Sequence, residues 1–333
     1  MIHSKKLVDE VPNWLRLYDD GSVDRTWTGP PEAKFIVESV PSHEEFIDEV
    51  ATRDIIANGN LRIRLYFPKR ISNDEGKLPI FLHFHGGGFC ITESDSYMYY
   101  QFYTKLVRFS QVIVVSPFLR RAPENRLPAA IDDGFSTLLW LQSIAKGDVD
   151  ESWLKNHGNF NRVFLIGDSS GANIVHQVAS RTGKVQLDSL QLTGGILIDP
   201  GFVRSSRSKS ELEKPMSPIL TLEMVDKLLN LALPLGSNKD HPITCPMGGG
   251  APPLSGLKLP PFLLCVAEMD LMIDTQMEYY EAMLKANKDV ELFVSKGMTH
   301  CFYLNKIAVD MDPNTASQTN ALIARIQEFV EKH

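Results

Sequence analysis

The stretch RVFLIGDSSGANIVH, residues 162–176, places two adjacent serines between two glycines, directly after an apolar run. The run 163–166 predicts a buried strand, and the residues that follow the glycines predict a helix. Gly167-x-Ser169-x-Gly171 between a strand and a helix is typical of a nucleophile elbow, in which a sharp turn exposes a serine hydroxyl above a sheet. Glycine and serine are also common in ordinary turns, so these residues alone leave both interpretations open.

Apolar runs and helical segments alternate along most of the chain. Four nearly continuous apolar runs fit strands that are covered on both faces, namely 80–84, 112–115, 163–166 and 262–266. Helical segments are expected at 95–108, 127–145, 170–182, 273–286 and 315–331. This alternation predicts an α/β fold with a mostly parallel central sheet flanked by helices. The run 61–67, where apolar and basic residues alternate, predicts instead a half-exposed antiparallel strand.

Two segments break this alternation. Residues 1–45 are polar and rich in turn residues, and residues 203–245 combine a basic, serine-rich piece with an amphipathic helix. Apolar residues of that helix recur at helical spacing from Leu222 to Leu229. We expect one α/β domain over residues 1–333, with the two segments as a small helical cap over the sheet. Surface decoration is the alternative for both segments, and the pattern does not separate the two interpretations.

The composition is that of an ordinary globular protein, with 43% hydrophobic and 23% charged residues. A formal net charge of −7 disfavours nucleic acid as a partner. The four cysteines are scattered without zinc-site spacing, which suits reduced, partly buried thiols. No apolar run is long enough to insert into a membrane, and neither end of the chain carries a targeting signal. We therefore expect a cytoplasmic protein, with the nucleus as an alternative location.

A serine hydroxyl is a weak nucleophile at neutral pH unless a base accepts its proton. His300 lies in a loop just after the strand candidate 290–294, where such a base belongs. An imidazole base needs a carboxylate to hold its tautomer, and Asp270 follows another apolar run. The order Ser169, Asp270, His300 is the order expected for α/β-hydrolases. Asp274 is the rival acid, but we expect it to begin a helix, where a carboxylate favours the N-terminal dipole.

The motif HGGGF follows the first of the apolar runs. Glycines in series let backbone N–H groups converge on a developing oxyanion. We expect the amides of Gly86 and Gly87, together with that of Ser170, to form an oxyanion hole. His83 and His85 could instead suggest metal ligation, but the sequence offers no third ligand near them. Neither a metal nor a cofactor is therefore predicted.

Together these motifs resemble those of the plant carboxylesterases in the hormone-sensitive-lipase branch of the α/β-hydrolases. The resemblance covers nearly the whole chain and rests on five motifs: HFHGGGF (83–89), RAPENRLPAAIDD (121–133), GDSSGAN (167–173), AEMDLMID (267–274) and GMTHCFY (297–303). Residues 119–124 read LRRAPE where the family usually carries YRLAPE, in a part that is mainly structural in relatives.

The resemblance implies a serine carboxylesterase that works through an acyl-serine intermediate. It implies Ser169 as nucleophile, His300 as base and Asp270 as orienting acid. Gibberellin receptors share the fold but have lost the catalytic histidine, which this chain keeps. Dehydratase-like relatives tend to carry threonine at the nucleophile position, which this chain does not. A lyase or cyclase on the same scaffold and a non-catalytic hormone receptor are therefore kept as alternatives.

The expected partner is a small-molecule ester. Apolar residues near the motifs favour a small to medium apolar carboxylic ester, with Phe89, Met224 and Phe302 as substrate-binding residues. Each of the three side chains could instead only pack the core. By resemblance alone, the substrate is expected to be a plant hormone ester, a specialised-metabolite ester or a butenolide of the strigolactone type.

Overall fold

The computed structural model describes residues 5–70, 76–217 and 219–333. The absence of a targeting signal was predicted from the N-terminal residues, and the first four of these lie outside the described residues. An eight-stranded sheet has the strand order β11-β10-β9-β8-β6-β7-β5-β4. Its strands are β4 (Val50–Ala57), β5 (Leu61–Pro68), β6 (Leu78–Phe84), β7 (Ile113–Pro117), β8 (Gly158–Asp168), β9 (Leu192–Ile198), β10 (Phe262–Ala267) and β11 (Val290–Ser295). Strands β6 to β11 pair in parallel, whereas β4 with β5 and β5 with β7 pair antiparallel. This arrangement confirms the predicted α/β fold.

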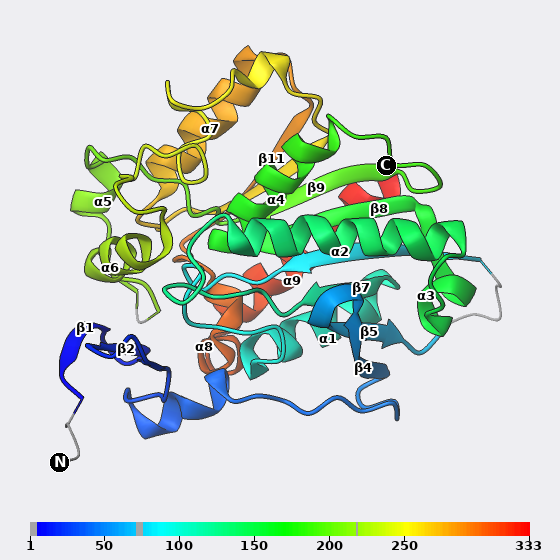
Figure 1. Cartoon of the computed structure of the whole chain (residues 1–333), viewed down its shortest axis with the longest axis horizontal. Helices are drawn as coiled ribbons and strands as arrows, with labels where there is room; N and C mark the ends of the chain where they lie inside the picture. The colour runs from blue at the N-terminus through cyan, green and yellow to red at the C-terminus, as the bar shows by residue number, and fades with distance from the viewer. Residues whose placement is uncertain (1–4, 71–75, 218) are drawn as a thin grey trace.

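Helices cover both faces of the sheet (Figure 1). One core contains residues of α2 (Ala129–Lys146), α3 (Ser152–His157), α4 (Ser170–Thr182) and α7 (Ile273–Lys285). The core of the other face contains residues of α1 (Tyr97–Ser110) and α9 (Pro313–Lys332). All five predicted helices are present. The boundaries of each lie within two residues of the prediction.

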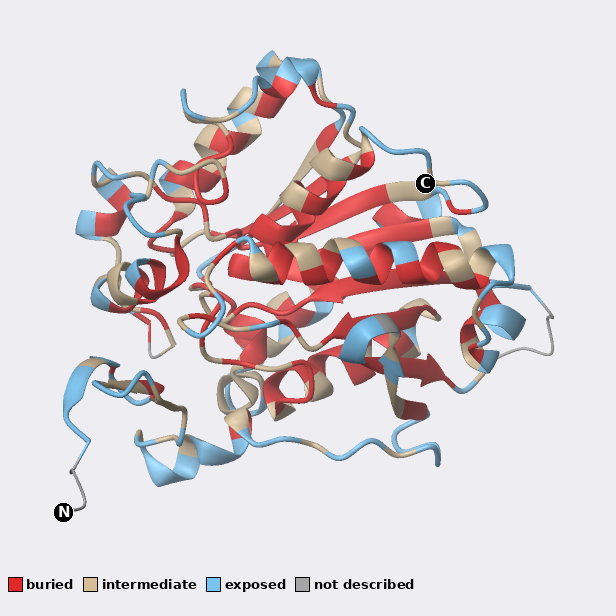
Figure 2. Ribbon diagram, viewed as in Figure 1, coloured by how far each residue is buried: buried red, intermediate tan, exposed pale blue. Residues whose placement is uncertain are grey.

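The central strands supply both cores at once, because successive side chains of a strand point to opposite faces. Leu82 and Leu165 belong to one core, and Phe81 and Phe164 belong to the other. Figure 2 shows β6 as buried along its whole length and β8 as buried over its last six residues. Burial on both faces is the reason why they read as uninterrupted apolar runs.

The prediction of a half-exposed strand at 61–67 is wrong for most of β5, whose last six residues are buried. Arg64 is 0% exposed. Its guanidinium donates to the two carboxylate oxygens of Asp54 at 2.5 and 2.9 Å and to the carbonyl of Val40 at 2.7 Å. A buried charge is tolerated when it is paired and hydrogen-bonded in this way.

A separate three-stranded antiparallel sheet is formed by β1 (Leu7–Val11), β2 (Leu15–Tyr18) and β3 (Val23–Asp24). It lies beside α6 (Leu222–Ala232), near α5 (Lys209–Glu213), in Figure 1. Lys227 of α6 donates to the carbonyl of Glu10 at 2.8 Å. Arg25 donates to both carboxylate oxygens of Glu124 and to the carbonyl of Cys90. The two segments that break the strand–helix alternation therefore contact one another and the loop after β6.

The remaining short elements are η1 (Pro31–Val37), η2 (Asn58–Asn60), η3 (Leu254–Gly256), η4 (Phe302–Leu304) and α8 (Lys306–Met311). Within the described ranges, no helix has both the length and the apolar character that crossing a membrane requires. All four cysteines fall within these ranges as free thiols, and they are more deeply buried than the predicted partial burial.

Candidate active site

Ser169 occupies a sharp turn between β8 and α4. Its φ of 50° and ψ of −124° are values that residues with a side chain rarely adopt. The flanking glycines let the chain close on itself, because a Cβ at Gly171 would lie 2.0 Å from the carbonyl oxygen of Phe84. A Cβ at Gly167 would lie 2.5 Å from the carbonyl oxygen of Gly171. The local geometry is therefore that of a nucleophile elbow, which holds the hydroxyl at the carboxyl end of the sheet.

The two adjacent serines have different surroundings. Ser170 is only 3% exposed, and its hydroxyl accepts a hydrogen bond from the Phe89 amide at 3.2 Å. Among the described residues, none forms a hydrogen bond with the Ser169 hydroxyl, and Ser169 lines a cavity that His300 also lines. The hydroxyl of Ser169 is thus the one available to a ligand.

His300 and Asp270 are directly hydrogen-bonded. The Nδ1 of His300 lies 2.7 Å from Oδ2 of Asp270, and both side chains are buried. The Asp270 carboxylate also accepts from Nε2 of Gln276 at 2.8 Å and from the amide of Met272 at 2.9 Å. A carboxylate that accepts from Nδ1–H leaves Nε2 of the imidazole as the proton acceptor.

Asp274, the rival acid, is placed elsewhere. It lies in the first turn of α7, and its carboxylate accepts from the amide of Ser210 at 2.7 Å. The expectation that this carboxylate begins a helix is confirmed. The pair that the sequence favoured, Asp270 with His300, is the one that the fold brings into contact.

Three buried carboxyl groups affect the titration of His300. Burial alone lowers its pKa, but the charge and hydrogen bond of Asp270, followed by the charges of Asp199 and Asp168, raise the pKa above its ordinary value. Burial also raises the pKa of Asp168 to about 7. The site therefore favours the imidazolium ion that forms when a histidine accepts a serine proton.

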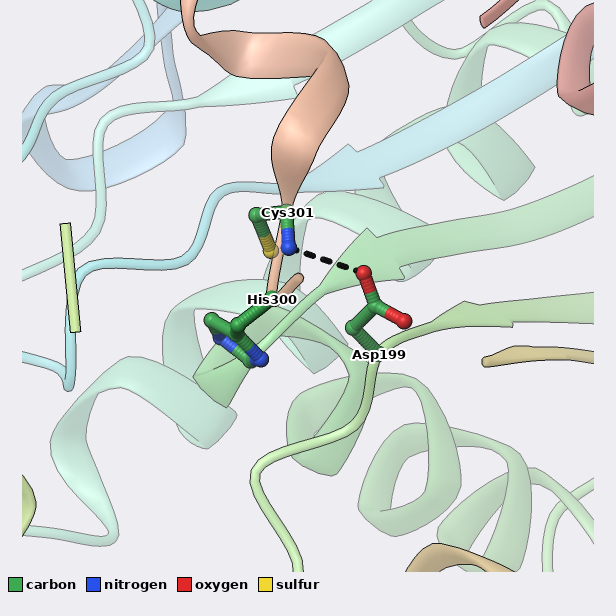
Figure 3. A group of neighbouring side chains, drawn as sticks. All are labelled: Asp199, His300 and Cys301. Atoms are coloured by element: carbon green, nitrogen blue, oxygen red, sulfur yellow. Dashed lines mark hydrogen bonds between the residues drawn. The ribbon is translucent and has the colours of Figure 1, made fainter. Parts of the chain in front are cut away.

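One cluster has the composition of a metal site: Asp199, His300 and Cys301, whose potential ligand atoms lie within 4.8 Å of one another (Figure 3). Two of the three side chains that could hold a metal, however, already have hydrogen-bond partners. Asp199 accepts from the amides of Ala267 at 2.7 Å and Cys301 at 2.8 Å, and Nδ1 of His300 is bound to Asp270. Burial also raises the pKa of the Cys301 thiol, which disfavours the thiolate that a metal would need. The contacts of Asp199 instead hold the loop of His300 against β10.

The glycine loop after β6 lies beside the elbow, because β6 and β8 are neighbours and Phe84 pairs with Gly167. The amide of Gly86 lies near the buried Asp168 carboxyl and lowers its pKa, against the larger effect of burial. Gly87 and Gly88 both line the cavity next to Ser169. No hydrogen-bond acceptor among the described residues engages the amides of these two glycines. Two glycines whose amides have no acceptor among the described residues thus line the cavity.

The two histidines that suggested a metal have other roles in the structure. Nδ1 of His83 lies 2.8 Å from the Ser116 hydroxyl, and Nδ1 of His85 lies 3.1 Å from the Gly86 carbonyl oxygen. Burial lowers the pKa of His83 and lowers that of His85 to about 3, so both rings are neutral. They fix the strand end and the glycine loop.

The cavity around Ser169 has two chambers, which share Gly88, Ser169, Leu220 and Leu228. The histidine chamber has a volume of about 50 Å³ and includes Thr92, Tyr99, Asp168, Met224, His300 and Leu304 in its wall. The apolar chamber has a volume of about 40 Å³ and includes Phe89, Ser170, Val203, Val225, Leu229 and Met272 in its wall.

Two of the three residues predicted to bind substrate line these chambers. Met224 lies in the histidine chamber and Phe89 in the apolar chamber. Phe302 lines neither of them. It is packed in the second core with its ring 5.6 Å from that of Tyr303, and it borders a separate surface pocket. For Phe302 the structure favours the alternative that the side chain packs the core.

The sequence model of the family described as the alpha/beta hydrolase fold matches residues 81–304. This span contains the glycine loop, the elbow, Asp270 and His300. The chain belongs to the α/β-hydrolase fold family. Its relatives place it in the plant carboxylesterase branch that is related to hormone-sensitive lipase.

Three plant relatives cover most of this α/β-hydrolase. "Probable carboxylesterase 6" of Arabidopsis thaliana is 35% identical over 305 residues, covering 90% of this chain and 85% of that protein. "Tuliposide A-converting enzyme b2, amyloplastic" of Tulipa gesneriana is 31% identical, covering 94% and 79%. "2-hydroxyisoflavanone dehydratase" of Glycyrrhiza echinata is 34% identical, covering 98% and 97%.

A solved structure, carboxyl esterase 2 from the mycorrhizal fungus Tuber melanosporum, shares the fold with a TM-score of 0.69. It is 19% identical, and the match covers 86% of this chain and 90% of that one. The family and its relatives make this chain a hydrolase of the carboxylesterase type.

Three residues of this site were not predicted from the sequence. Asp199 follows β9, a strand that was missed, although the apolar run before this acid was a signal. Gln276 contacts Asp270 from the first turns of α7, and no local motif marks it. Gly88 belongs to the predicted glycine motif, but the sequence does not tell which of its amides face the cavity.

Proposed function

We propose that this α/β-hydrolase is a serine carboxylesterase that hydrolyses a small to medium apolar carboxylic ester through an acyl-serine intermediate. The contact that carries the proposal is the 2.7 Å hydrogen bond between His300 and Asp270. It joins the base His300 to the acid Asp270, and His300 lines the same cavity as Ser169, which occupies the sharp turn after β8.

The proposed reaction begins when the Ser169 hydroxyl attacks the ester carbonyl carbon while Nε2 of His300 accepts the serine proton. Asp270 keeps the imidazole in the required tautomer and stabilises its positive charge. The tetrahedral intermediate collapses, and the alcohol leaves with the proton from His300. Water then attacks the acyl-serine in the same way, with His300 again as base, and releases the acid. No step requires a cofactor.

For the oxyanion hole we propose the amides of Gly87, Gly88 and Ser170. Gly87 and Ser170 were expected, and Gly88 takes the place of Gly86. The support is that Gly87 and Gly88 line the cavity with amides that have no acceptor, whereas the Gly86 amide faces Asp168. The amide of Ser170 is at the first turn of α4, where helix N–H groups have no intrahelical partner. One such donor is worth roughly 3–4 kcal/mol in the transition state.

We further propose that residues 1–333 form one α/β-hydrolase domain with a cap made of segments 1–45 and 203–245. Support comes from α6, whose Leu228 packs on Gly88, and from Trp14, which borders the histidine chamber. The proposed location is the cytoplasm, which fits free, buried thiols. Relatives named as amyloplastic or chloroplastic make plastids the competing location.

The substrate we propose is an ester or butenolide lactone of a plant hormone or specialised metabolite. A second function, dehydration, is favoured by one specific observation: the 2-hydroxyisoflavanone dehydratase aligns over 98% of this chain. The same residues would serve a dehydratase as an acid–base relay without acylation of Ser169. Acylation therefore discriminates the two.

The test is covalent labelling with a fluorophosphonate, followed by a panel of acyl esters and lactones and by 2-hydroxyisoflavanone. Wild-type protein is expected to label at Ser169 and to release acid and alcohol from an ester. Ser169→Ala is expected to do neither. Conversion of 2-hydroxyisoflavanone with no hydrolysis of any ester would replace the esterase proposal with the lyase.

A further inference from the structure

We infer that Asp199 is a positioning residue of this site and that its carboxyl group fixes the loop of His300 relative to the loop of Asp270. This inference rests on the proposed esterase function, because it gives Asp199 a part in the same reaction. Asp199 does not line the cavity around Ser169. It therefore acts through His300 and not through contact with the ester.

One carboxyl group joins the two loops. Its Oδ1 accepts a hydrogen bond from the amide of Ala267 at 2.7 Å. Its Oδ2 accepts from the amide of Cys301 at 2.8 Å, the bond that Figure 3 draws. Ala267 is the last residue of β10, and its carbonyl accepts from the amide of Asp270 at 3.1 Å. Because Cys301 directly follows His300, the two bonds of Asp199 end beside the acid and beside the base.

The loop of His300 is held on both sides of the histidine. Before it, the carbonyl of Met298 accepts from the amide of Met269 at 2.8 Å. After it, the amide of Cys301 donates to Asp199. The first bond joins two backbone groups, whereas the second depends on a single side chain. Asp199 is therefore a residue at which a substitution can move the imidazole.

Both partners of the bond between Asp199 and Cys301 have an unusual backbone. The φ angle is 43° at Asp199 and 48° at Cys301, and residues with a side chain rarely adopt such values. The amide of Asp199 is held in turn by the carbonyl of Cys265 in β10, at 2.8 Å. Strained conformations persist where the surrounding contacts enforce them, and they cluster at functional sites. The carboxyl group thus stabilises a strained turn directly after His300.

A carboxylate suits this position because both of its partners are backbone N–H donors. A carboxylate has two acceptor oxygens and no donor, whereas an amide side chain would turn its NH₂ toward one of the N–H groups. Asp199 is 1% exposed, and burial, followed by the charge of Asp270, raises its pKa. Burial lowers the pKa of His300, and the charge of Asp199 adds to the larger effect of Asp270 in raising it. The buried charge therefore favours the imidazolium ion.

The other titratable groups around Asp199 are neutral near neutral pH. Burial is the largest cause that raises the pKa of three neighbouring side chains, and the charge of Asp199 adds to it: Cys265, Cys301 and Tyr303. The largest charges that act on Asp199 are those of Asp270 and His300, and Asp168 acts on the same imidazole. The effect of Asp199 on the pH dependence is therefore measured at His300.

The first variant is Asp199→Asn, which keeps the shape of the side chain and removes its charge and one acceptor. At the pH plateau kcat should fall about tenfold or more, because one of the two bonds to the loops is lost, and KM for p-nitrophenyl acetate should stay within about twofold. The acid limb should move to lower pH by about half a unit or more, because removal of a negative charge lowers the pKa of His300. A role confined to folding would change neither kcat nor the acid limb.

Asp199→Glu separates position from charge. It keeps the charge but extends the side chain by about 1.5 Å, so that the two oxygens no longer meet both amides. The value of kcat should fall about tenfold or more, because a displacement of about 1 Å in catalytic geometry has an effect of that order. The acid limb should stay at the wild-type pH. A wild-type kcat in this variant would show that only the charge matters and would overturn the inference.

The matched control is Asp133→Asn. Asp133 is 7% exposed, and its two oxygens also accept from N–H groups, the amide of Arg120 at 2.7 Å and Nε of Arg120 at 2.8 Å. The control should lose stability in a thermal melt, as Asp199→Asn does, and should keep the wild-type kcat and acid limb. An Asp199→Asn protein that behaves like wild type or like this control overturns the inference.

The rate at which a fluorophosphonate labels Ser169 over the same pH range is a second readout, because labelling needs the base but no hydrolysis of an ester. Labelling without hydrolysis in wild-type protein would refute the proposed function, and the labelling rates of the variants would still test Asp199. Neither labelling nor hydrolysis would refute both. Failure of both Asp199 variants to fold would show that the carboxyl group serves the fold, and would overturn its assignment as a positioning residue.

Discussion

Asp270→Asn is the substitution that the site makes most informative, because it removes a charge and leaves a side chain of the same shape. The carboxylate is completely buried and accepts three hydrogen bonds, from His300, Gln276 and the amide of Met272. Asparagine offers one acceptor oxygen, so its NH₂ group must face one of these donors. Both orientations of the amide are unfavourable.

If the NH₂ takes the place of Oδ2, it faces His300, whose Nδ1 must then become the acceptor. The proton moves to Nε2, and the ring can no longer accept the serine proton. If the NH₂ takes the place of Oδ1, it faces the Met272 amide, and a buried donor without an acceptor costs about 1–3 kcal/mol. In both cases the imidazolium loses its counter-charge. The comparable loss in a triad is about 10⁴ in kcat, which is about 5 kcal/mol of transition-state stabilisation.

The control is Asp274→Asn. This exposed carboxylate accepts from the Ser210 amide, and asparagine keeps an oxygen for that bond. The variant should lose up to about 1 kcal/mol of helix stability through the dipole and keep nearly all activity. The assay is kcat/KM for p-nitrophenyl acetate, with a thermal melt of both variants. Equal activity of the two variants, or a larger loss in Asp274→Asn, would refute the assignment of the acid.

Three further outcomes are expected. Ser169→Ala should lose on the order of 10⁴–10⁶ in kcat. Ser170→Ala lacks only the acceptor for the Phe89 amide and should stay active. An inactive Ser170→Ala together with an active Ser169→Ala would identify Ser170 as the nucleophile. Activity should fall as the pH drops through the pKa of His300, because the protonated imidazole cannot accept the serine proton; the neighbours of His300 place this pKa above the ordinary value of about 6.5. The variant His300→Val should have no turnover at any pH. Tight ester binding by wild-type protein, without an acyl-serine or a product, would show that the protein is a receptor. Gln276→Leu should lower kcat/KM about tenfold by removing one donor to the carboxylate, and an unchanged pH–rate profile and kcat/KM would show that Gln276 does not position it.

Hydrophobic patterning predicted six strands of the eight-stranded sheet, but it missed β4 and β9. The sequence of β9, LTGGILI, is interrupted by a threonine and two glycines. Both glycines are required by packing, because a Cβ at Gly194 would lie 2.9 Å from rings of Phe164 and Phe329. A Cβ at Gly195 would lie 2.6 Å from the ring of Phe262. The residue type at such a position depends on large side chains that are distant in the sequence, and a local hydrophobic pattern does not contain that information.

The candidate site divides in the same way. Ser169, Asp270 and His300 were predictable because each lies at or shortly after the end of a strand, and the carboxyl ends of parallel strands meet at one edge of a sheet. Gln276 and Asp199 were not, because they act through contacts that depend on the relative position of α7, β9 and the His300 loop. The same limit applies to the three glycines of the loop, since the backbone turn decides which amides point into the cavity.

Asp199, which was not predicted from the sequence, is one of three buried carboxyl groups close to His300, and the pKa values of two of them explain how the site accommodates all three. Asp168, Asp199 and Asp270 all surround one imidazole, and three ionised carboxylates beside a single imidazolium would leave a net charge of about −2 in a buried volume. Burial and the charge of Asp270 raise the pKa of Asp199, and burial raises that of Asp168, so protonation of these two relieves the repulsion near neutral pH. Asp270 is the carboxyl group of the three that is hydrogen-bonded to Nδ1 of His300. The acid limb of the rate profile consequently belongs to the whole cluster, because groups that interact this closely release their protons in shared steps.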